Sequence, residues 1–299
     1  MINRILSYIK SIANKIKRRE KMKYLDINQA VEEIKCLIET AIINGGESKK
    51  NNLIRSQKPI CILHDVVKAS FIDHGVHPDL VKPIYGEHRG EIKLAGFFKQ
   101  KNQDICFMPR AVKAEKEILK FDGILKGVSD KYGFNLTEKI LSVNVRSQLS
   151  SSAKNFDTLY ERTFAEALNL HLRCPKMVLG EFYMIPVYEY DNKLAKQRII
   201  SFKENNQIHK HLEKYIHAFN AINNRTDIES QEYKYERVCL LIVDFNRPKP
   251  KIYNYTKELI KDGLLPTNTD AQIENINFPS FTRSLLDIYN QRFGNGNFK

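Results

Sequence analysis

The stretch from Leu141 to Arg173 changes its hydrophobic period part-way, and this change constrains the fold more than any other feature of the chain. Leu141, Val143 and Val145 alternate with polar residues, which is the pattern of a strand with one apolar face. After a serine-rich tract at 148–154, apolar side chains recur at helical spacing. The sequence therefore predicts a strand that leads through a polar turn into a helix, with polar groups held on both elements.

The overall charge favours a polyanionic partner. The 299 residues include 48 Lys and Arg against 35 Asp and Glu, a formal net charge of +13. This balance points to nucleic acid first and to an anionic membrane surface second, although a lysine-rich proteome would give the same balance without functional meaning. The five cysteines form no CxxC pair, so we expect reduced core residues in a cytoplasmic protein. No apolar run approaches the roughly 20 residues of a membrane helix.

The N-terminal part of the sequence is predicted to be helical. Residues 1–22 form a basic amphipathic segment, which suits a membrane-surface helix, a nucleic-acid arm or an ordinary packed helix, or else an extension upstream of a start at Met22. Residues 26–44 predict an amphipathic helix that Asp26 or Asn28 caps. Gly45-Gly46 ends it, and a polar loop follows at 47–57.

The rest of the chain predicts alternating strands and helices. Residues 91–110 indicate two strands of a hairpin or meander, residues 111–139 a helix, and residues 177–190 and 237–245 strands. We therefore expect an α/β (α+β) fold with a central mixed sheet flanked by helices. The division expected is a helical region at 1–58 and an α/β domain at 59–299, which together form one compact unit.

Five polar positions in this framework suit phosphodiester hydrolysis. Asp104 opens the second strand of 91–110, Asn144 and Arg146 share one face of the next strand, and Glu161 and Glu166 follow on the helix. Hydrolysis of a phosphodiester needs carboxylates that hold Mg²⁺ and a cation near the phosphate. The alternative is structural, with Asp104 capping its own turn and the glutamates solvated.

This order resembles the PD-(D/E)XK nuclease superfamily, and more narrowly the type II restriction endonucleases. In that pattern an aspartate at a strand start is followed by acidic-x-lysine on the next strand. In the branch that cuts sites with a CCGG core, a glutamate on the following helix replaces the acidic residue. The segments that carry the resemblance are Gln103-Asp104-Ile105-Cys106, Val143-Asn144-Val145-Arg146-Ser147, and Tyr160-Glu161 or Ala165-Glu166-Ala167-Leu168-Asn169-Leu170.

The resemblance implies a restriction-endonuclease-like fold and a role for each matching residue. Asp104 and Glu161, with Glu166 as second choice, would bind Mg²⁺, and Arg146 or Lys154 would neutralise the developing charge. Asn144 stands at the acidic position and Arg146 at the lysine position, and the same departures would fit a member without catalytic activity. The residues expected to contact DNA are Ser147, Gln148, Ser150, Ser151, Ser152, Asn155 and Arg162.

The sequence thus favours a Mg²⁺-dependent, site-specific double-stranded DNA endonuclease. Such an enzyme would act as a homodimer or higher homo-oligomer, because the symmetry of the protein mirrors that of a palindromic site. A cognate DNA methyltransferase would be its genetic partner. The alternatives are a non-catalytic nucleic-acid-binding protein that uses a basic face, and a membrane-surface protein anchored by residues 1–22.

Overall fold

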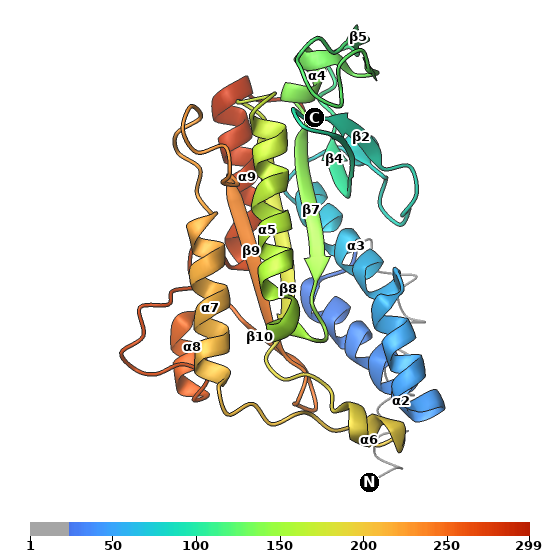
Figure 1. The fold of residues 1–299 in the computed structure, drawn as a ribbon, viewed down its shortest axis with the longest axis vertical. Helices are drawn as coiled ribbons and strands as arrows, with labels where there is room; N and C mark the ends of the chain where they lie inside the picture. Colours follow the sequence, from blue (N-terminus) through green and yellow to red (C-terminus); the bar gives the residue numbers. More distant parts are fainter. Residues whose placement is uncertain (1–23) are drawn as a thin grey trace.

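The structure, a computed structural model, describes residues 24–299 and builds them around one six-stranded sheet (Figure 1). The strands lie in the order β1-β4-β7-β8-β9-β10. β7, β8 and β9 run parallel to one another, whereas β1, β4 and β10 pair antiparallel with their neighbours. The predicted α/β class with a central mixed sheet is confirmed. The strand bounds are Val81–Lys82 (β1), Ile105–Phe107 (β4), Leu141–Ser147 (β7), Val178–Pro186 (β8), Arg237–Asp244 (β9) and Lys251–Tyr253 (β10).

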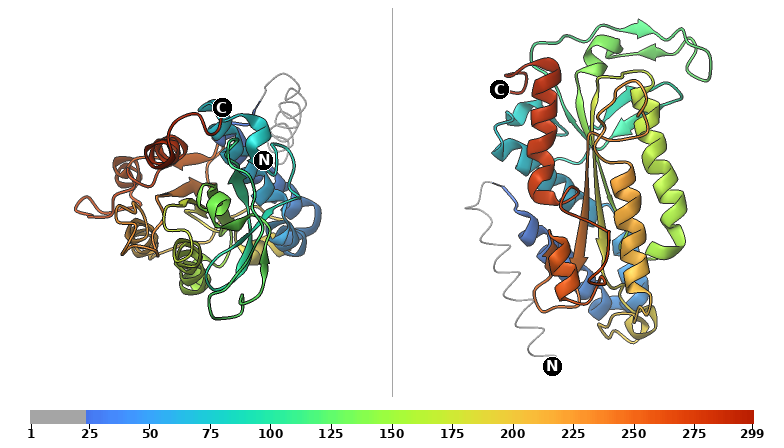
Figure 2. Two further views of the ribbon diagram at one scale, coloured as in Figure 1. Left: turned by 90° about the horizontal axis from the view of Figure 1, so that it is seen from above. Right: turned by 90° about the vertical axis from the view of Figure 1, so that its left-hand side faces the viewer.

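Helices cover both faces of this sheet, as the edge-on view in Figure 2 shows. One face packs against α2 (Ile27–Arg55), α3 (Lys58–Asp73) and α9 (Phe278–Phe293), and the other packs against α5 (Ser152–His171) and α7 (Ile208–Ala221). Smaller elements complete the described chain: η2 (Pro78–Leu80), α4 (Gly133–Glu138), α6 (Asn192–Lys196), α8 (Thr256–Lys261), and two two-stranded sheets made by β2 (Ile92–Ala95) with β3 (Gln100–Gln103) and by β5 (Glu117–Ile118) with β6 (Ser129–Asp130).

The strand and helix predicted around residues 141–171 are confirmed as β7 and α5. Val143 and Val145 belong to the core that contains α2, α3 and α9. Because successive side chains of a strand point to opposite faces, Asn144 and Arg146 face α5 instead. The connection between β7 and the parallel β8 is α5 itself, so the polar face of the strand lies under the helix that follows it.

The central strand β8 is buried along its whole length of nine residues. Parallel strands covered by helices on both faces are apolar almost throughout, because neither face meets water. Gly180 suits the crowded face under α9, since a methyl group there would lie 2.7 Å from the side chain of Leu285. Glu181 is the exception to the apolar character of the strand, and its side chain is fully buried.

Two predictions of local structure are wrong, namely the loop at 47–57 and the single helix at 111–139. The helix predicted at 26–44 is interrupted at Gly45-Gly46 as expected, because both glycines have non-helical backbone angles, and Asp26 caps its start. A second helical segment follows directly and runs to Arg55, so the loop predicted at 47–57 is wrong. Residues 111–139 do not form one helix. Gly123, Gly127 and Gly133 take positive φ angles there, and the segment folds instead into β5, β6 and α4.

Segment 91–110 forms the predicted meander, with β2 and β3 as a hairpin and β4 in the main sheet. The predicted helical region at 1–58 shares its core with the α/β region as far as it is described, since Val31 and Phe182 belong to one apolar cluster. The amphipathic segment 1–22 lies outside the described residues. Among residues 24–299, no helix combines the length and the apolar character that crossing a membrane requires.

The packing of α9 on β8 gives a direct test of this core. Leu285 is completely buried between the helix and the sheet. Leu285→Ala should lower the free energy of unfolding by about 2–5 kcal/mol, because it leaves a cavity as well as removing apolar contacts. Urea denaturation measures this loss. Ile199→Ala is the control, since that side chain is 47% exposed and should change stability by less than about 0.5 kcal/mol. Equal effects at the two sites would contradict the assigned packing.

Candidate functional site

Asp104 lies at the start of β4, where the chain turns from the β2–β3 hairpin into the main sheet. β4 pairs antiparallel with β7, and Ile105 lies opposite Val143. The next position therefore places Asp104 beside Asn144 on β7. Its carboxylate is held in this place because Oδ2 accepts a hydrogen bond from the backbone N–H of Val145, at 2.8 Å. Sequence reasoning thus placed this residue correctly relative to β7.

Arg146 connects the strand, the helix above it and the neighbouring strand. Its guanidinium forms ion pairs with Glu166 of α5 and with Glu181 of β8. It also donates a hydrogen bond to the hydroxyl of Thr163, at 3.2 Å. One charged side chain, Arg146, therefore joins the strand and the helix of the predicted strand–turn–helix unit. We call Lys101, Asp104, Arg146, Glu166 and Glu181 the Arg146 cluster.

Lys101 brings a second cation into the cluster from the β2–β3 hairpin. Its ammonium pairs with the same carboxylate oxygen of Glu166 that Arg146 contacts. Glu166 is buried, whereas the Lys101 side chain is 39% exposed, so the cluster opens to solvent on the side of the hairpin. The Lys101 ammonium therefore lies at the open side of the cluster. Its positive charge there offsets the negative charge of Glu166 and attracts an anion from solvent.

The hairpin is held against α5 by Asn169, one turn after Glu166. The side-chain Oδ1 of Asn169 accepts hydrogen bonds from the backbone N–H groups of Phe98 and Lys99, and its Nδ2 donates to the Lys99 carbonyl oxygen. Gly96 allows this approach, because a Cβ there would lie 2.2 Å from the Asn169 amide nitrogen. The position of Lys101 is therefore set by backbone contacts, and not by its own flexible side chain.

The Arg146 cluster contains more negative than positive charge. Three carboxylates face two cations, and two buried carboxylate oxygens, Glu166 Oε1 and Glu181 Oε2, have no hydrogen-bond partner. Burial raises the pKa of Asp104 to about 6, although the Val145 N–H and Arg146 act in the opposite direction. Burial likewise raises the pKa of Glu181 to about 7, against the lowering effect of Arg146. The cluster therefore favours uptake of a proton or of a further cation.

Glu161 and Lys154 do not join this cluster, so their predicted roles are corrected. Glu161 is exposed, because five residues place it about 140° around the helix axis from Glu166. Lys154 is exposed in the first turn of α5, about 18 Å along the axis from Glu166. The carboxylate at the site is Glu166, which sequence reasoning ranked second, and the lysine is Lys101.

Asn144 lies at the predicted place but carries no charge. It is buried on the face of β7 that meets α5, and it lies opposite Glu181 in the register of the two parallel strands. No hydrogen bond to its side chain occurs within residues 24–299. The negative charge missing at this position is thus present on the neighbouring strand.

The predicted DNA-contacting residues divide into accessible and inaccessible groups. Ser152 is buried, with its hydroxyl bonded to the Gln148 carbonyl oxygen and its N–H to Glu189, so it is not available to DNA and that prediction is wrong. The Gln148 amide bonds within the same turn, to the Ser150 carbonyl oxygen. The predicted residues with at least partly exposed side chains are Ser147, Gln148, Ser150, Ser151, Asn155 and Arg162.

The donor set of the cluster is compatible with Mg²⁺ when a substrate supplies further ligands. In the described part of the chain, no group of three or more His, Cys, Asp or Glu side chains is arranged to hold a metal ion. Mg²⁺ is usually bound by only one or two carboxylates together with waters and substrate phosphates. Asp104 and Glu166 meet this lower requirement, and Glu166 has one oxygen without a partner.

Sequence reasoning missed Glu181 and Lys101. A signal for Glu181 was present, because a single carboxylate within the apolar strand Val178–Pro186 costs free energy unless it is paired or functional. Lys101 had no comparable signal, since it belongs to the polar tract 99–103 and only the folded hairpin brings it to Glu166. No protein-family model, curated protein or solved structure matches the chain.

The raised pKa of Glu181 predicts a pH-dependent contribution to stability. In the folded chain this carboxyl takes up a proton near pH 7, whereas its ordinary pKa is 4.5. The contribution is therefore fully present below about pH 4.5 and is lost as the pH rises through about 7. The free energy of unfolding of the wild type minus that of Glu181→Gln should fall between about pH 5 and pH 8. Urea denaturation over a pH series measures it, and a flat or rising difference would contradict the assignment.

Proposed function

We propose that the chain is a Mg²⁺-dependent DNA endonuclease that hydrolyses phosphodiester bonds. The observation that carries this proposal is the meeting of Asp104, Arg146 and Glu166, from three separate elements, in one cluster that opens to solvent. A carboxylate pair beside two cations is the combination that phosphodiester hydrolysis needs.

The positions of these residues agree with the resemblance to the PD-(D/E)XK nucleases. An aspartate at a strand start pairs with the next strand, and a glutamate on the following helix stands in for the acidic residue that Asn144 replaces. The structure favours the branch with the relocated glutamate, since Glu166 and not Asn144 supplies the second carboxylate. On the basis of the same resemblance, we extend the proposal to a site-specific, type II enzyme.

Asp104 and Glu166 would hold the Mg²⁺ ion. When bound, the ion supplies an acidified water as nucleophile and neutralises charge on the phosphate. The chain itself contributes two fixed cations, Arg146 and Lys101, whose positive charge favours a phosphate at the open side of the cluster. Arg146 cannot act as a proton acceptor, because an arginine remains protonated at all accessible pH values. Its role is to bind and orient the phosphate.

Glu181 has a different role, because it lies behind Arg146 and is fully buried. A carboxylate in this place fixes the guanidinium by a charge-assisted hydrogen bond and keeps its remaining donors directed away from β8. We therefore treat Glu181 as a positioning residue for Arg146. Its distance from solvent leaves it no direct contact with a large substrate.

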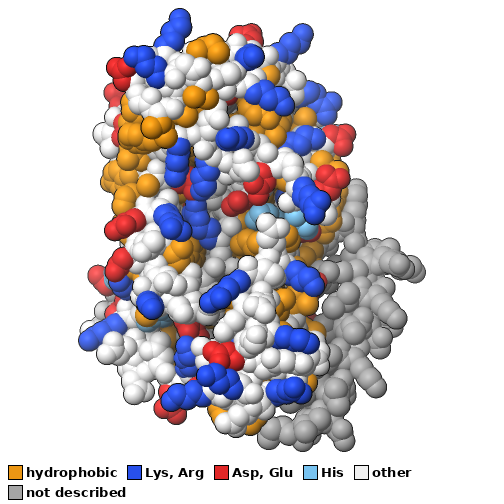
Figure 3. Space-filling view, turned by 45° about the vertical axis from the view of Figure 1, so that its right-hand side comes forward, with side chains coloured by type: hydrophobic (Ala, Val, Ile, Leu, Met, Phe, Trp, Pro, Cys, Tyr) orange, Lys and Arg blue, Asp and Glu red, His pale blue; other side chains and the backbone are white. Residues whose placement is uncertain are grey.

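The surface charge supports a nucleic-acid substrate. Lys and Arg side chains are spread over the face shown in Figure 3, and the chain as a whole has a formal net charge of +13. Positive charge of this extent attracts the phosphate backbone regardless of sequence. Recognition of a palindrome by a homodimer, and a methyltransferase that protects the host site, complete the proposal for a type II restriction enzyme.

Substitution of the two carboxylates tests the proposed activity. Asp104→Asn and Glu166→Gln should each reduce cleavage of long unmethylated DNA by at least about 100-fold, the scale expected when one preorganised charged group is removed. Gel analysis of the products in the presence of Mg²⁺ measures this loss. Glu161→Gln is the matched control, because it removes a carboxylate from the same helix at an exposed position. Its cleavage should equal that of the wild type.

The outcome also separates the enzyme from a non-catalytic DNA-binding protein. Cleavage that is lost in both cluster variants, with retained binding in a gel-shift assay, supports the endonuclease. DNA retardation by the wild type without any cleavage, over a range of divalent cations and unmethylated DNA substrates, would favour the binding protein instead.

A further inference from the structure

One face of α5, together with the turn that follows its end at His171, connects the Arg146 cluster to a second feature of the molecule. Glu166, Asn169 and Arg173 recur at helical spacing, and the β2–β3 hairpin runs alongside them. Lys101 contacts Glu166, Lys99 contacts Asn169, and the Ala95 carbonyl oxygen accepts a hydrogen bond from Arg173 at 2.6 Å. The five helical steps from Glu166 to His171 rise about 7.5 Å, and the turn residues Leu172 and Arg173 extend the track to roughly 10 Å. The hairpin and the helix therefore form one short track that starts at the proposed catalytic cluster.

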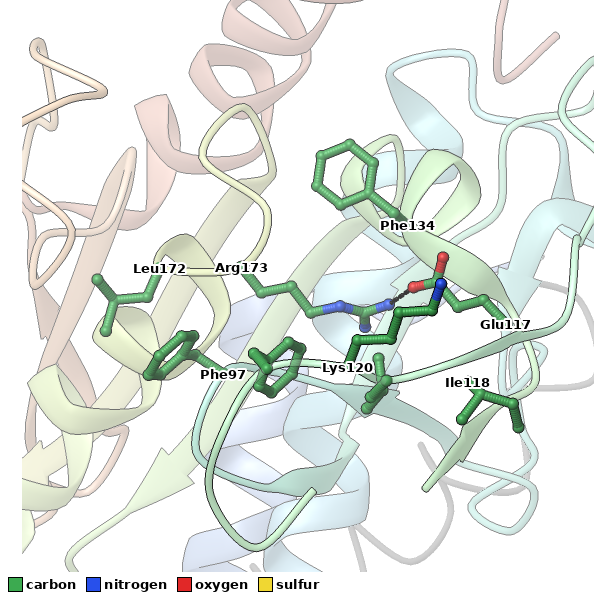
Figure 4. A pocket seen from close by; sticks show the side chains of 9 residues that line it. Phe97, Glu117, Ile118, Lys120, Phe134, Leu172 and Arg173 are labelled. Carbon is green, nitrogen blue, oxygen red and sulfur yellow. Dashed lines mark hydrogen bonds and ion pairs between the residues drawn. The ribbon is translucent and has the colours of Figure 1, made fainter. Parts of the chain in front are cut away.

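An aromatic pocket lies at the other end of this track (Figure 4). It has a volume of about 770 Å³, which is within the usual range of small-molecule sites. Phe97 comes from the hairpin, Phe134 from α4 and Leu172 from the end of α5. Phe97 stacks on Phe121 with their ring centroids 5.2 Å apart. The ion pair between Arg173 and Glu117 crosses the pocket, as Figure 4 shows.

The apolar lining of this pocket is unusually accessible. Ile118 is 52% exposed, Phe134 42% and Leu172 39%, and the neighbouring Phe98 is 51% exposed. These residues come from four separate segments, so their exposure is not the property of one loose loop. A contiguous exposed apolar surface on a folded domain usually marks a binding site. The flat aromatic side chains favour a flat ligand.

The charges around the pocket favour a ligand that carries phosphate. Lys120 lies on its rim and has no ion-pair or hydrogen-bond partner for its ammonium within residues 24–299. Arg173 is by contrast already bound, to Glu117, Asp130 and Ala95. The sequence between residues 93 and 131 holds nine Lys and Arg against five Asp and Glu. An aromatic recess with a basic surround suits a nucleobase attached to a charged backbone.

We propose that this aromatic pocket receives an unpaired nucleobase of the nucleic acid whose phosphate lies at the Arg146 cluster. The inference rests on the proposed function for the position of the phosphate. The track of about 10 Å corresponds to about three stacked nucleotides of one strand, at 3.4 Å each. The base stacks on the phenylalanine rings, and Lys120 contacts a flanking phosphate.

Binding of two single-stranded oligonucleotides of equal charge tests this proposal without any cleavage. The first is a twelve-residue oligothymidylate, and the second is a fully abasic sugar–phosphate of the same length. Both carry a fluorescent label, and anisotropy in the absence of divalent metal gives their dissociation constants. The wild type should prefer the base-containing strand by about five- to 100-fold, the range expected for a base stacked on an aromatic side chain.

Phe134→Ala should abolish this preference by weakening binding of the oligothymidylate while leaving binding of the abasic strand unchanged. Ile199→Ala is the control, because that side chain is similarly exposed but does not line the pocket. An unchanged urea midpoint in both variants shows that they are folded. Equal loss for both strands, or no loss for either, would overturn the proposal, since the pocket would then contact no base.

The same variants distinguish this proposal from the proposed activity. If Phe134→Ala binds both strands like the wild type while Asp104→Asn loses cleavage, the pocket assignment fails and the endonuclease stands. If the preference for bases depends on Phe134 although no variant or wild type cuts DNA, the pocket assignment stands and the catalytic one fails. Saturable binding of a neutral aromatic compound with no affinity for either strand would overturn the nucleobase assignment in favour of a small-molecule site.

Discussion

The charge balance around the Arg146 guanidinium is the interaction on which the arrangement of the site depends. Two buried glutamates, one on α5 and one on β8, would repel each other and resist burial without a cation between them. Arg146 supplies that cation from β7, the strand that both elements flank. A strand, its crossover helix and the next parallel strand are thus joined by one side chain in addition to their apolar contacts. Arg146 is thus both the buried cation of the cluster and the residue that connects these three elements.

This interaction also decides which glutamate serves the site. Glu161 and Glu166 lie on the same helix, but only Glu166 lies on the helix face that packs over Arg146. The hairpin adds Lys101 to the same carboxylate because Asn169 and Gly96 hold its backbone close to α5. The result is a cluster whose inner side is buried and whose outer side carries the partly exposed ammonium of Lys101. This asymmetry is what a site for a large anionic substrate requires.

The sequence predicted the elements with a clear hydrophobic period and failed where glycine or tertiary contacts decide. β7 and α5 follow from alternation and helical spacing, and Asp104 was placed correctly because it directly precedes a strand. Residues 111–139 have a helical composition, yet three glycines with positive φ angles divide the segment. Lys101 and Glu181 reach the site only through the hairpin contact and the parallel register, and neither is written in local spacing. Ser152 illustrates the same limit, since its backbone N–H bonds to Glu189, which is distant in the sequence.

α5 carries Glu166 and ends at His171, directly before Leu172 and Arg173 at the rim of the pocket. A continuous α-helix hardly stretches, because its hydrogen bonds fix the rise per residue. The distance between the Arg146 cluster and the pocket is consequently constant, and a polymer that binds at both places must match it. Insertion of a residue between Glu166 and His171 would rotate the end of the helix by about 100° relative to Glu166 and would change the separation between the cluster and the pocket.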